Sequence, residues 1–392
     1  MTTLRLALID GPTYAPLHDI LPAFTATTGI AVEIAARLPH AELNALLARE
    51  IDAFDLVSTH IKYAPSQVAH LRELDDLLTA DDLAPFLDAP LAQCRIDGAL
   101  TQLPRHTDTR LLVYRTDLIA TPPGTWEELA DIAAAVTTEA IAGFAFCGQP
   151  SGLFGGFFEL LASAGESLQD ASGRIDVTTD AATWALRFLH ELHVSRRVTP
   201  AAMLAWDFGD VTAAFMRGEV AMIGDWPGSF ALLTDPAQSP VADRIGIARY
   251  PAGPSGQRRV YSGSHTFAIT QTSRDVPAAT ALLRALTSVE AQLIEGRRGA
   301  IPTRRDVAAI LRAEATTPFA QQRLDLLAQT VATDMISFPP LTTYPRIEEI
   351  AWPMLTAALR DELLIPDTLA QMQAAIDADP AIRTELAAGV RP

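Results

Sequence analysis

The sequence predicts an α/β fold built from doubly wound, mainly parallel sheets flanked by helices. Two observations predict it. Short apolar runs of strand length alternate with amphipathic helical stripes along the first sixty residues, and no part of the chain repeats or forms a long apolar span. With 49% hydrophobic and 20% charged residues, the composition is typical of a globular chain. At about 150 residues per domain, 392 residues allow two or three units.

The opening of the chain carries the clearest alternation. Leu4–Ile9, Ile30–Ile34 and Phe54–Val57 are apolar runs of strand length, and residues 17–24 and 43–51 place an apolar residue every three or four positions. This strand–helix–strand–helix–strand order implies a parallel sheet with right-handed crossovers. Ligands of such open sheets bind beyond the carboxyl ends of the strands, so the loops after the first and third strands are candidate binding loops.

The middle of the chain keeps this α/β character but is richer in helix. Thr125 and Glu128 have the spacing of a capping box, in which the hydroxyl accepts one free amide of the first turn and the carboxylate reaches back to another. Val220–Ile223 is an apolar run of strand length, and Asp225 and Trp226 follow it in the loop at its carboxyl end. The strand-end rule therefore predicts a tryptophan and a carboxylate together at a binding edge.

The charge balance argues against polyanionic partners. The chain has 47 Asp and Glu against 30 Lys and Arg, a net charge of −17 that would repel nucleic acid. Two cysteines, Cys94 and Cys147, are too few and too distant for a disulfide framework or a zinc site. No nucleotide-binding, metalloprotease or nucleophile-elbow motif is present, so we expect no cofactor and no metal. Lys62 is the only lysine, which we interpret as coding bias without functional meaning.

Several motifs, in a fixed order along the chain, resemble one family. Ala214–Trp226 combines a phenylalanine, a helix-ending glycine, an Ala-Met strand and a terminal tryptophan. Thr28–Val32 resembles the family's opening "TGI.V", Pro123–Leu129 its "P.TW.EL" helix start, and Gly299–Thr303 its "G.iPt" turn. Together they make the chain similar to the bacterial extracellular solute-binding proteins of carbohydrate ABC transporters, the maltose-binding-protein-like type.

The resemblance implies a two-lobed, periplasmic-binding-protein-like clamshell with the ligand cleft between the lobes. Residues 1–107 plus 264–305 would form the N-terminal lobe, and residues 108–263 plus 306–392 the C-terminal lobe. The implied function is that of the substrate-binding component of an ABC import system, which closes by hinge motion on a sugar or oligosaccharide. The expected partners are a small neutral solute and a membrane permease, with no nucleic acid, and the receptor is expected to be a monomer.

A sugar needs an aromatic face for its C–H groups and polar side chains for its rim of hydroxyls. The family places an aromatic ligand contact at the tryptophan matching Trp226, and Asp225 adds a carboxylate beside it. Further candidate ligand-binding residues follow the first and third strands or flank the two predicted crossings between lobes. They are Tyr14, Thr59, His60, Asp108, Gly263, Ser264 and His265.

Other interpretations stay open. The same clamshell could bind a non-sugar solute or act as an intracellular sensor, and Arg105, Arg110 and Arg297 could form a local basic site for an anion. A glycoside-acting enzyme is the remaining alternative, although we expect binding without catalysis. The apolar run after Met1 is too short for a signal peptide. We therefore expect an extracytoplasmic protein if a leader has been removed, and a cytoplasmic one if this is the native start.

Overall fold

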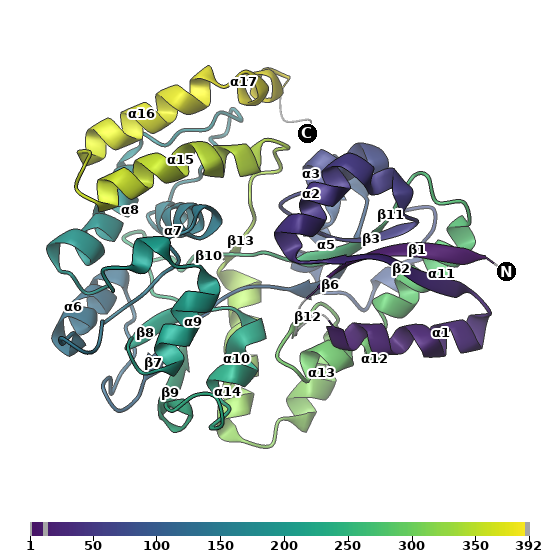
Figure 1. Ribbon diagram of the computed structural model, residues 1–392, viewed down its shortest axis with the longest axis horizontal. Coiled ribbons are helices and arrows are strands. Elements are labelled where there is room, and N and C mark those ends of the chain that lie inside the picture. The colour runs from purple at the N-terminus through teal and green to yellow at the C-terminus, as the bar shows by residue number, and fades with distance from the viewer. Residues whose placement is uncertain (1, 11–14, 389–392) are drawn as a thin grey trace.

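The computed structural model describes residues 2–10 and 15–388, which form two α/β lobes side by side (Figure 1). A six-stranded sheet forms one lobe and a three-stranded sheet lies in the other. The strands of the larger sheet, in spatial order, are β12 (Ile301–Pro302), β6 (Leu103–Thr107), β11 (His265–Ile269), β3 (Leu56–His60), β1 (Thr3–Ile9) and β2 (Ala31–Leu38).

Helices cover both faces of the larger sheet because side chains along β1 alternate between them. Leu4, Leu6 and Leu8 pack on α1 (Ile20–Thr28) and α11 (Val276–Leu286). Ala7 and Ile9 point the other way and pack on α2 (His40–Glu50). Around this sheet lie the shorter elements α3 (Ala64–Gln67), α4 (Ala80–Leu83), α5 (Asp88–Gln93), β4 (Arg95–Ile96), β5 (Ala99–Leu100) and α12 (Val289–Gly296).

The second lobe is built around β7 (Leu111–Arg115), which pairs with β8 (Met222–Asp225) on one side and β9 (Ile245–Ala248) on the other. Most of its core comes from helices, of which α7 is apolar almost all round. The helices associated with these strands are α6 (Trp126–Val136), α7 (Pro150–Ser163), α8 (Asp180–His190), α9 (Phe208–Met216), α10 (Phe230–Leu233), α15 (Tyr344–Leu359), α16 (Ile365–Ala378) and α17 (Pro380–Ala387).

The predicted two-lobed α/β fold is confirmed, but the expectation of mainly parallel sheets needs a correction. β1 pairs in parallel with β2 and β3, as the alternation of the opening residues predicts. β11, β6 and β12 pair antiparallel, as do β8 and β9 with β7. The reason lies in the chain path, because β6 and β11 run to and from the other lobe and are not joined to their neighbours by a helical crossover.

The chain passes between the two lobes at three places, two of them near the middle of Figure 1 and the third at its lower edge. β6 leads into β7 through residues 108–110, and β10 (Val260–Tyr261) leads into β11 through residues 262–264. A third path runs through α13 (Arg305–Glu314) and α14 (Pro318–Thr333). It ends at β13 (Met335–Ile336), which pairs with β10. The residue limits of the two lobes stay a prediction. They place the third crossing after residue 305, whereas the packing of α13 on α12 and β12 favours a crossing after α13.

The start of α6 shows how closely the hydrogen bonds of a helix cap can be predicted from the sequence. Thr125 Oγ1 accepts the backbone N–H of Glu128 at 3.1 Å, as expected of a capping box. The Glu128 carboxylate reaches one residue further than predicted, to the N–H of Gly124 at 2.6 Å. Within the described ranges, no helix combines the length and the apolar character needed to cross a membrane.

Gly224 lets β8 pass directly beneath Tyr250. A Cβ at Gly224 would lie 1.4 Å from the Tyr250 hydroxyl oxygen, so any side chain must displace that ring. We expect Gly224→Ala to lower the free energy of unfolding by about 1–3 kcal/mol, the usual cost of overpacking. Denaturant unfolding followed by circular dichroism measures this change.

Gly156 provides the matched control, because a Cβ there would meet no atom within 4 Å. Gly156 lies inside α7, where alanine favours the helix by up to about 1 kcal/mol. Gly156→Ala should therefore keep or raise the stability. A Gly224→Ala protein as stable as the parent would contradict the close approach.

Candidate functional site

A cavity of about 450 Å³ is lined by residues of both lobes and of the crossings, a size suited to a small solute. Its lining falls into three groups. The larger sheet's lobe contributes His40, His60, Lys62, Tyr63 and Ala300. The crossings and their strands contribute His106, Asp108, Tyr261, Gly263 and His265. The second lobe's helices and loops contribute Ser151, Phe208, Trp226, Gly228 and Phe338.

One wall of the cavity is aromatic. Trp226 follows β8, and its ring meets Phe208 and Tyr261 edge to face, with centroids 5.5 Å and 5.4 Å away. The Arg110 guanidinium lies over the indole at 5.0 Å and over the Tyr261 ring at 4.5 Å. Glu159 fixes Arg110 through a 2.6 Å bond. The indole is thus held from behind, and its N–H has no hydrogen-bond partner among the described residues.

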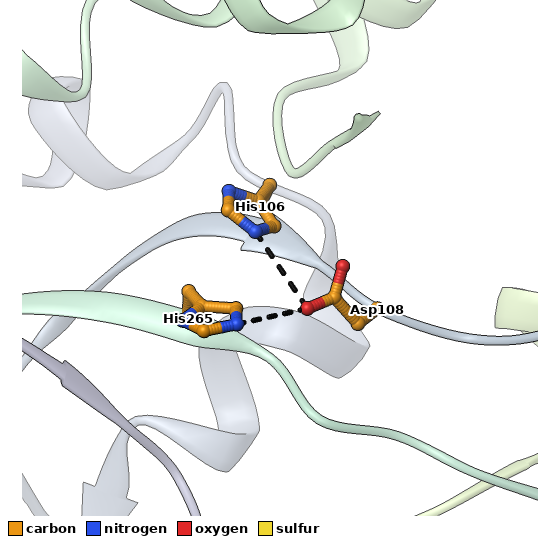
Figure 2. Close-up of side chains that lie close together, drawn as sticks. All are labelled: His106, Asp108 and His265. Carbon is orange, nitrogen blue, oxygen red and sulfur yellow. Dashed lines mark ion pairs between the residues drawn. The ribbon is translucent and has the colours of Figure 1, made fainter. Parts of the chain in front are cut away.

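The floor of the cavity holds a carboxylate between two imidazoles. His265 Nε2 lies 3.0 Å and His106 Nε2 3.6 Å from the same oxygen of Asp108, and both rings point at it (Figure 2). Burial alone would raise the pKa of Asp108, but the two imidazoles lower it well below its usual range. Asp108 lies in the first crossing, while His106 lies near the end of β6 and His265 begins the neighbouring strand β11.

A second carboxylate supports His106 from behind. Glu295 Oε2 lies 3.8 Å from His106 Nδ1, and the Arg105 Nε donates to Glu295 at 2.8 Å. Burial alone would lower the pKa of His106, but Asp108 and Glu295 raise it to about 9. The chain of buried Arg105, Glu295 and His106 and of Asp108, whose side chain is 18% exposed, therefore alternates in charge. This alternation compensates charges that are largely removed from water.

Two further imidazoles border the floor. The His40 and His60 rings are 5.0 Å apart, and each lies within about 5 Å of the His265 ring. Burial lowers the pKa of His40 to about 3, and electrostatic repulsion of a protonated His40 by His265 and Lys62 acts in the same direction. Burial likewise lowers the pKa of His60. Both rings are therefore neutral near pH 7, and His60 Nδ1 accepts the backbone N–H of Lys62 at 3.1 Å.

Lys62 links the two lobes across the cavity. It follows β3, and its ammonium lies 2.7 Å from the Glu348 carboxylate on α15 and 3.0 Å from the Ser151 hydroxyl on α7. Both charged side chains are buried, with exposed fractions of 7% and 5%. Burial raises the pKa of Glu348, and the nearby ammonium opposes that rise. The ion pair therefore holds the lobes together in the described conformation.

The structure brings five of the nine predicted site residues to the cavity: Trp226, His60, Asp108, Gly263 and His265. Three others lie behind its wall with their polar atoms bonded to neighbours, and Tyr14 lies outside the described residues. Thr59 Oγ1 donates to Gln67. The Ser264 hydroxyl bonds Gln93 at 2.8 Å and contacts the hydroxyls of Thr107 and Ser262. Asp225 accepts from Thr212 at 2.9 Å.

Sequence reasoning missed several lining residues. Lys62 carried a signal, since it is the chain's single lysine and follows a predicted binding strand, but it was interpreted as coding bias. His106 also carried one, being two residues before Asp108. His40 and Phe208 gave no local signal, because each begins a helix and reaches the cavity only through the packing of the lobes.

The titration of the Asp225 carboxyl should make the free energy of unfolding depend on pH. Burial raises its pKa to about 7, although hydrogen bonds from Thr212 and Ser229 oppose the shift. Between pH 4 and 7 the folded state keeps a proton that the unfolded state has lost, so stability falls as the pH rises. Asp225→Asn removes this slope. On going from pH 4 to pH 8, the free energy of unfolding of this variant should rise relative to that of the parent by on the order of 3 kcal/mol. Denaturant unfolding at both pH values measures this change.

The control is Asp243→Asn, whose exposed carboxylate is 83% accessible and should leave the pH profile of stability unchanged. If the stability difference between Asp225→Asn and the parent does not vary with pH, the carboxyl is not held protonated in the folded protein.

Known proteins share this architecture. The sequence matches the family described as bacterial extracellular solute-binding protein over residues 12–293. Maltose-bound MalE3 of T. maritima has a TM-score of 0.84 at 25% identity, covering 96% of this chain and 99% of that one. A solute-binding protein of Agrobacterium radiobacter K84 in complex with ribitol has a TM-score of 0.80 at 22% identity, covering 98% of each chain.

Curated relatives give the same picture. A probable ABC transporter-binding protein of Deinococcus radiodurans is 30% identical over 236 residues, 57% of this chain, and the match spans only 56% of that relative's length. A probable amino-acid ABC transporter periplasmic-binding protein of Sinorhizobium fredii is 24% identical over 91% of this chain and 84% of its own. The chain therefore belongs to the bacterial extracellular solute-binding protein family.

Proposed function

We propose that this protein is the substrate-binding component of an ABC import system and binds a sugar or polyol in its inter-lobe cavity. One observation carries the proposal: the supported face of Trp226 and the polar floor of imidazoles and Asp108 line the same cavity. That pairing suits a molecule with a C–H face and a rim of hydroxyls. The maltose and ribitol complexes of structural relatives support it.

Each polar group of the cavity has a role in this scheme. The Asp108 carboxylate accepts hydrogen bonds from hydroxyls, neutral His40 can donate or accept one bond, and neutral His60 can donate one through Nε2 because its Nδ1 accepts the Lys62 N–H. The indole N–H of Trp226 and the hydroxyl of Tyr261 are buried and have no hydrogen-bond partner among the described residues. Binding proceeds without bond breaking, and the solute leaves unchanged.

Closure follows from the division of the lining between lobes. A solute that touches Trp226 and His60 together makes all its contacts only when the lobes are near, so binding shifts the population toward the closed form. The Lys62–Glu348 ion pair adds a protein contact that exists only in that form. A membrane permease would recognise the closed face, in the extracytoplasmic location of the relatives named as periplasmic.

The solute class can be tested by a thermal-shift screen over monosaccharides, oligosaccharides, polyols and amino acids, because a bound solute stabilises the folded state. We expect shifts with sugars or polyols. For the solute with the largest shift, Trp226→Ala should weaken binding at least tenfold in calorimetry, about 1.4 kcal/mol. Trp184→Ala is the control, since that ring stacks on Phe188 on α8.

Two results would contradict the proposal. Shifts with amino acids and none with sugars would overturn the proposed solute class. Amino acids are included in the screen because the Sinorhizobium relative is named as an amino-acid transporter's binding protein. Tight sugar binding that survives Trp226→Ala would remove the aromatic wall from the site.

The inter-lobe ion pair gives a second test. Lys62→Met leaves the Glu348 carboxylate buried without its partner, and breaking a buried pair in this way costs about 3–5 kcal/mol. The lobes avoid this cost by opening, so we expect solute affinity to fall at least fivefold in calorimetry while the melting temperature changes little. Lys62→Met combined with Glu348→Leu should recover part of the loss.

The control is Arg297→Met, which breaks an exposed pair with Glu314. Exposed pairs contribute about 0–1 kcal/mol, so this variant should bind solute as the parent does. Unchanged affinity in Lys62→Met would show that the ion pair does not favour closure.

A further inference from the structure

We propose that the floor of the cavity is a binding site for a divalent transition-metal ion of the zinc type, with His106, Asp108 and His265 as protein ligands. This goes beyond solute binding, because the site is complete without a solute. The three side chains come from two strands and a crossing, at positions 106, 108 and 265. Because His265 is far from the other two residues in the sequence, no ligand-spacing motif predicted the site.

The geometry fits a tetrahedral ion. At metal–ligand distances of about 2.0–2.1 Å, two ligand atoms of a tetrahedral zinc lie about 3.3 Å apart. His265 Nε2 and His106 Nε2 lie 3.0 Å and 3.6 Å from Asp108 Oδ2, on either side of that value. One ligand atom from each of the three residues lies within 4.8 Å of the other two. Both rings already point at the shared oxygen (Figure 2), so coordination needs only small side-chain shifts.

His40 is the best fourth ligand. Its Nε2 is buried and has no hydrogen-bond partner among the described residues, and its ring centroid lies 5.2 Å from that of His265. Two imidazoles that share a tetrahedral ion have centroids about 5 Å apart. His60 is less suitable, because its Nδ1 already accepts the Lys62 N–H and its Nε2 must then carry the ring proton. His40 also lines the cavity, so the ion would lie at its surface.

The surroundings resemble the outer partners of known metal sites. Metal-bound histidines commonly give their second ring nitrogen to a carboxylate, which orients the ring. Glu295 lies 3.8 Å from His106 Nδ1 and is itself fixed by Arg105. Coordination releases the ring protons that face Asp108 to solvent. Lys62, which also lines the cavity, is neutralised by Glu348 and does not oppose a second positive charge in the floor.

The donor set selects the kind of ion. Imidazole nitrogen with one carboxylate suits zinc and its first-row neighbours, whereas magnesium and calcium prefer oxygen ligands alone. We therefore expect zinc and cobalt to bind, and magnesium to have no effect at equal concentration.

The test uses the full chain, treated with a chelator and freed of solute, titrated with Zn²⁺ by calorimetry and with Co²⁺ by visible absorption. We expect one equivalent of zinc and the intense bands of four-coordinate cobalt. His265→Gln and Asp108→Asn should each weaken zinc binding at least tenfold. His70→Gln should not, although it removes a histidine with an aspartate 3.1 Å away on the surface.

No stoichiometric zinc binding by the parent would overturn the proposal, and so would equal affinity in both floor variants. If those variants fail to fold by circular dichroism, the cobalt spectrum of the parent decides, since weak six-coordinate bands would overturn the tetrahedral site. Solute binding is measured separately on the chelator-treated protein. Loss of the metal site therefore leaves the sugar proposal standing, and failure to bind sugars leaves the metal site standing.

Discussion

The carboxylate of Asp108 at the cavity floor is the constraint around which the rest of the cavity is arranged. It carries a negative charge at the point where the chain first leaves the larger sheet, and a charge that is mostly shielded from water must be compensated. His265 and His106 compensate it from the ends of two adjacent strands, and Asp108 also accepts the N–H of Gly263 through its backbone carbonyl at 3.0 Å. One residue thereby joins the first and second crossings, so the cavity floor and the hinge are the same piece of structure.

A second charged pair, the buried one between Lys62 and Glu348, connects the two lobes directly. The floor contacts stay within the crossings and their strands, whereas this pair spans from β3 to α15 and exists only when the lobes are near. Under the proposed closure, the protein would combine a fixed base with an inter-lobe contact that breaks when the lobes separate. A solute between Trp226 and the imidazoles would then add its contacts to the closed form, which the ion pair already favours.

Sequence patterns predicted those features of the fold that depend only on residues close together in the chain. The parallel strands β1, β2 and β3, the Thr125 cap and the strand that precedes Trp226 all follow from periodicity and cap chemistry. The antiparallel strands did not, because their direction is set by crossings between lobes. The site was predicted where residues end strands, as for His60, or flank a crossing between the lobes, as for His265. Asp225 ends β8 as His60 ends β3, but it points into its own lobe, and strand alternation alone could not show which way it turns.

The central claim, that a solute closes the two lobes over the floor formed by Asp108, is tested most directly by small-angle X-ray scattering. The radius of gyration of the parent protein is measured without solute and with a saturating concentration of the sugar or polyol that binds best. The account predicts a smaller radius with the solute, and a smaller change in Lys62→Met than in the parent at equal saturation. An unchanged radius in the parent, with binding verified in the same sample, would contradict it.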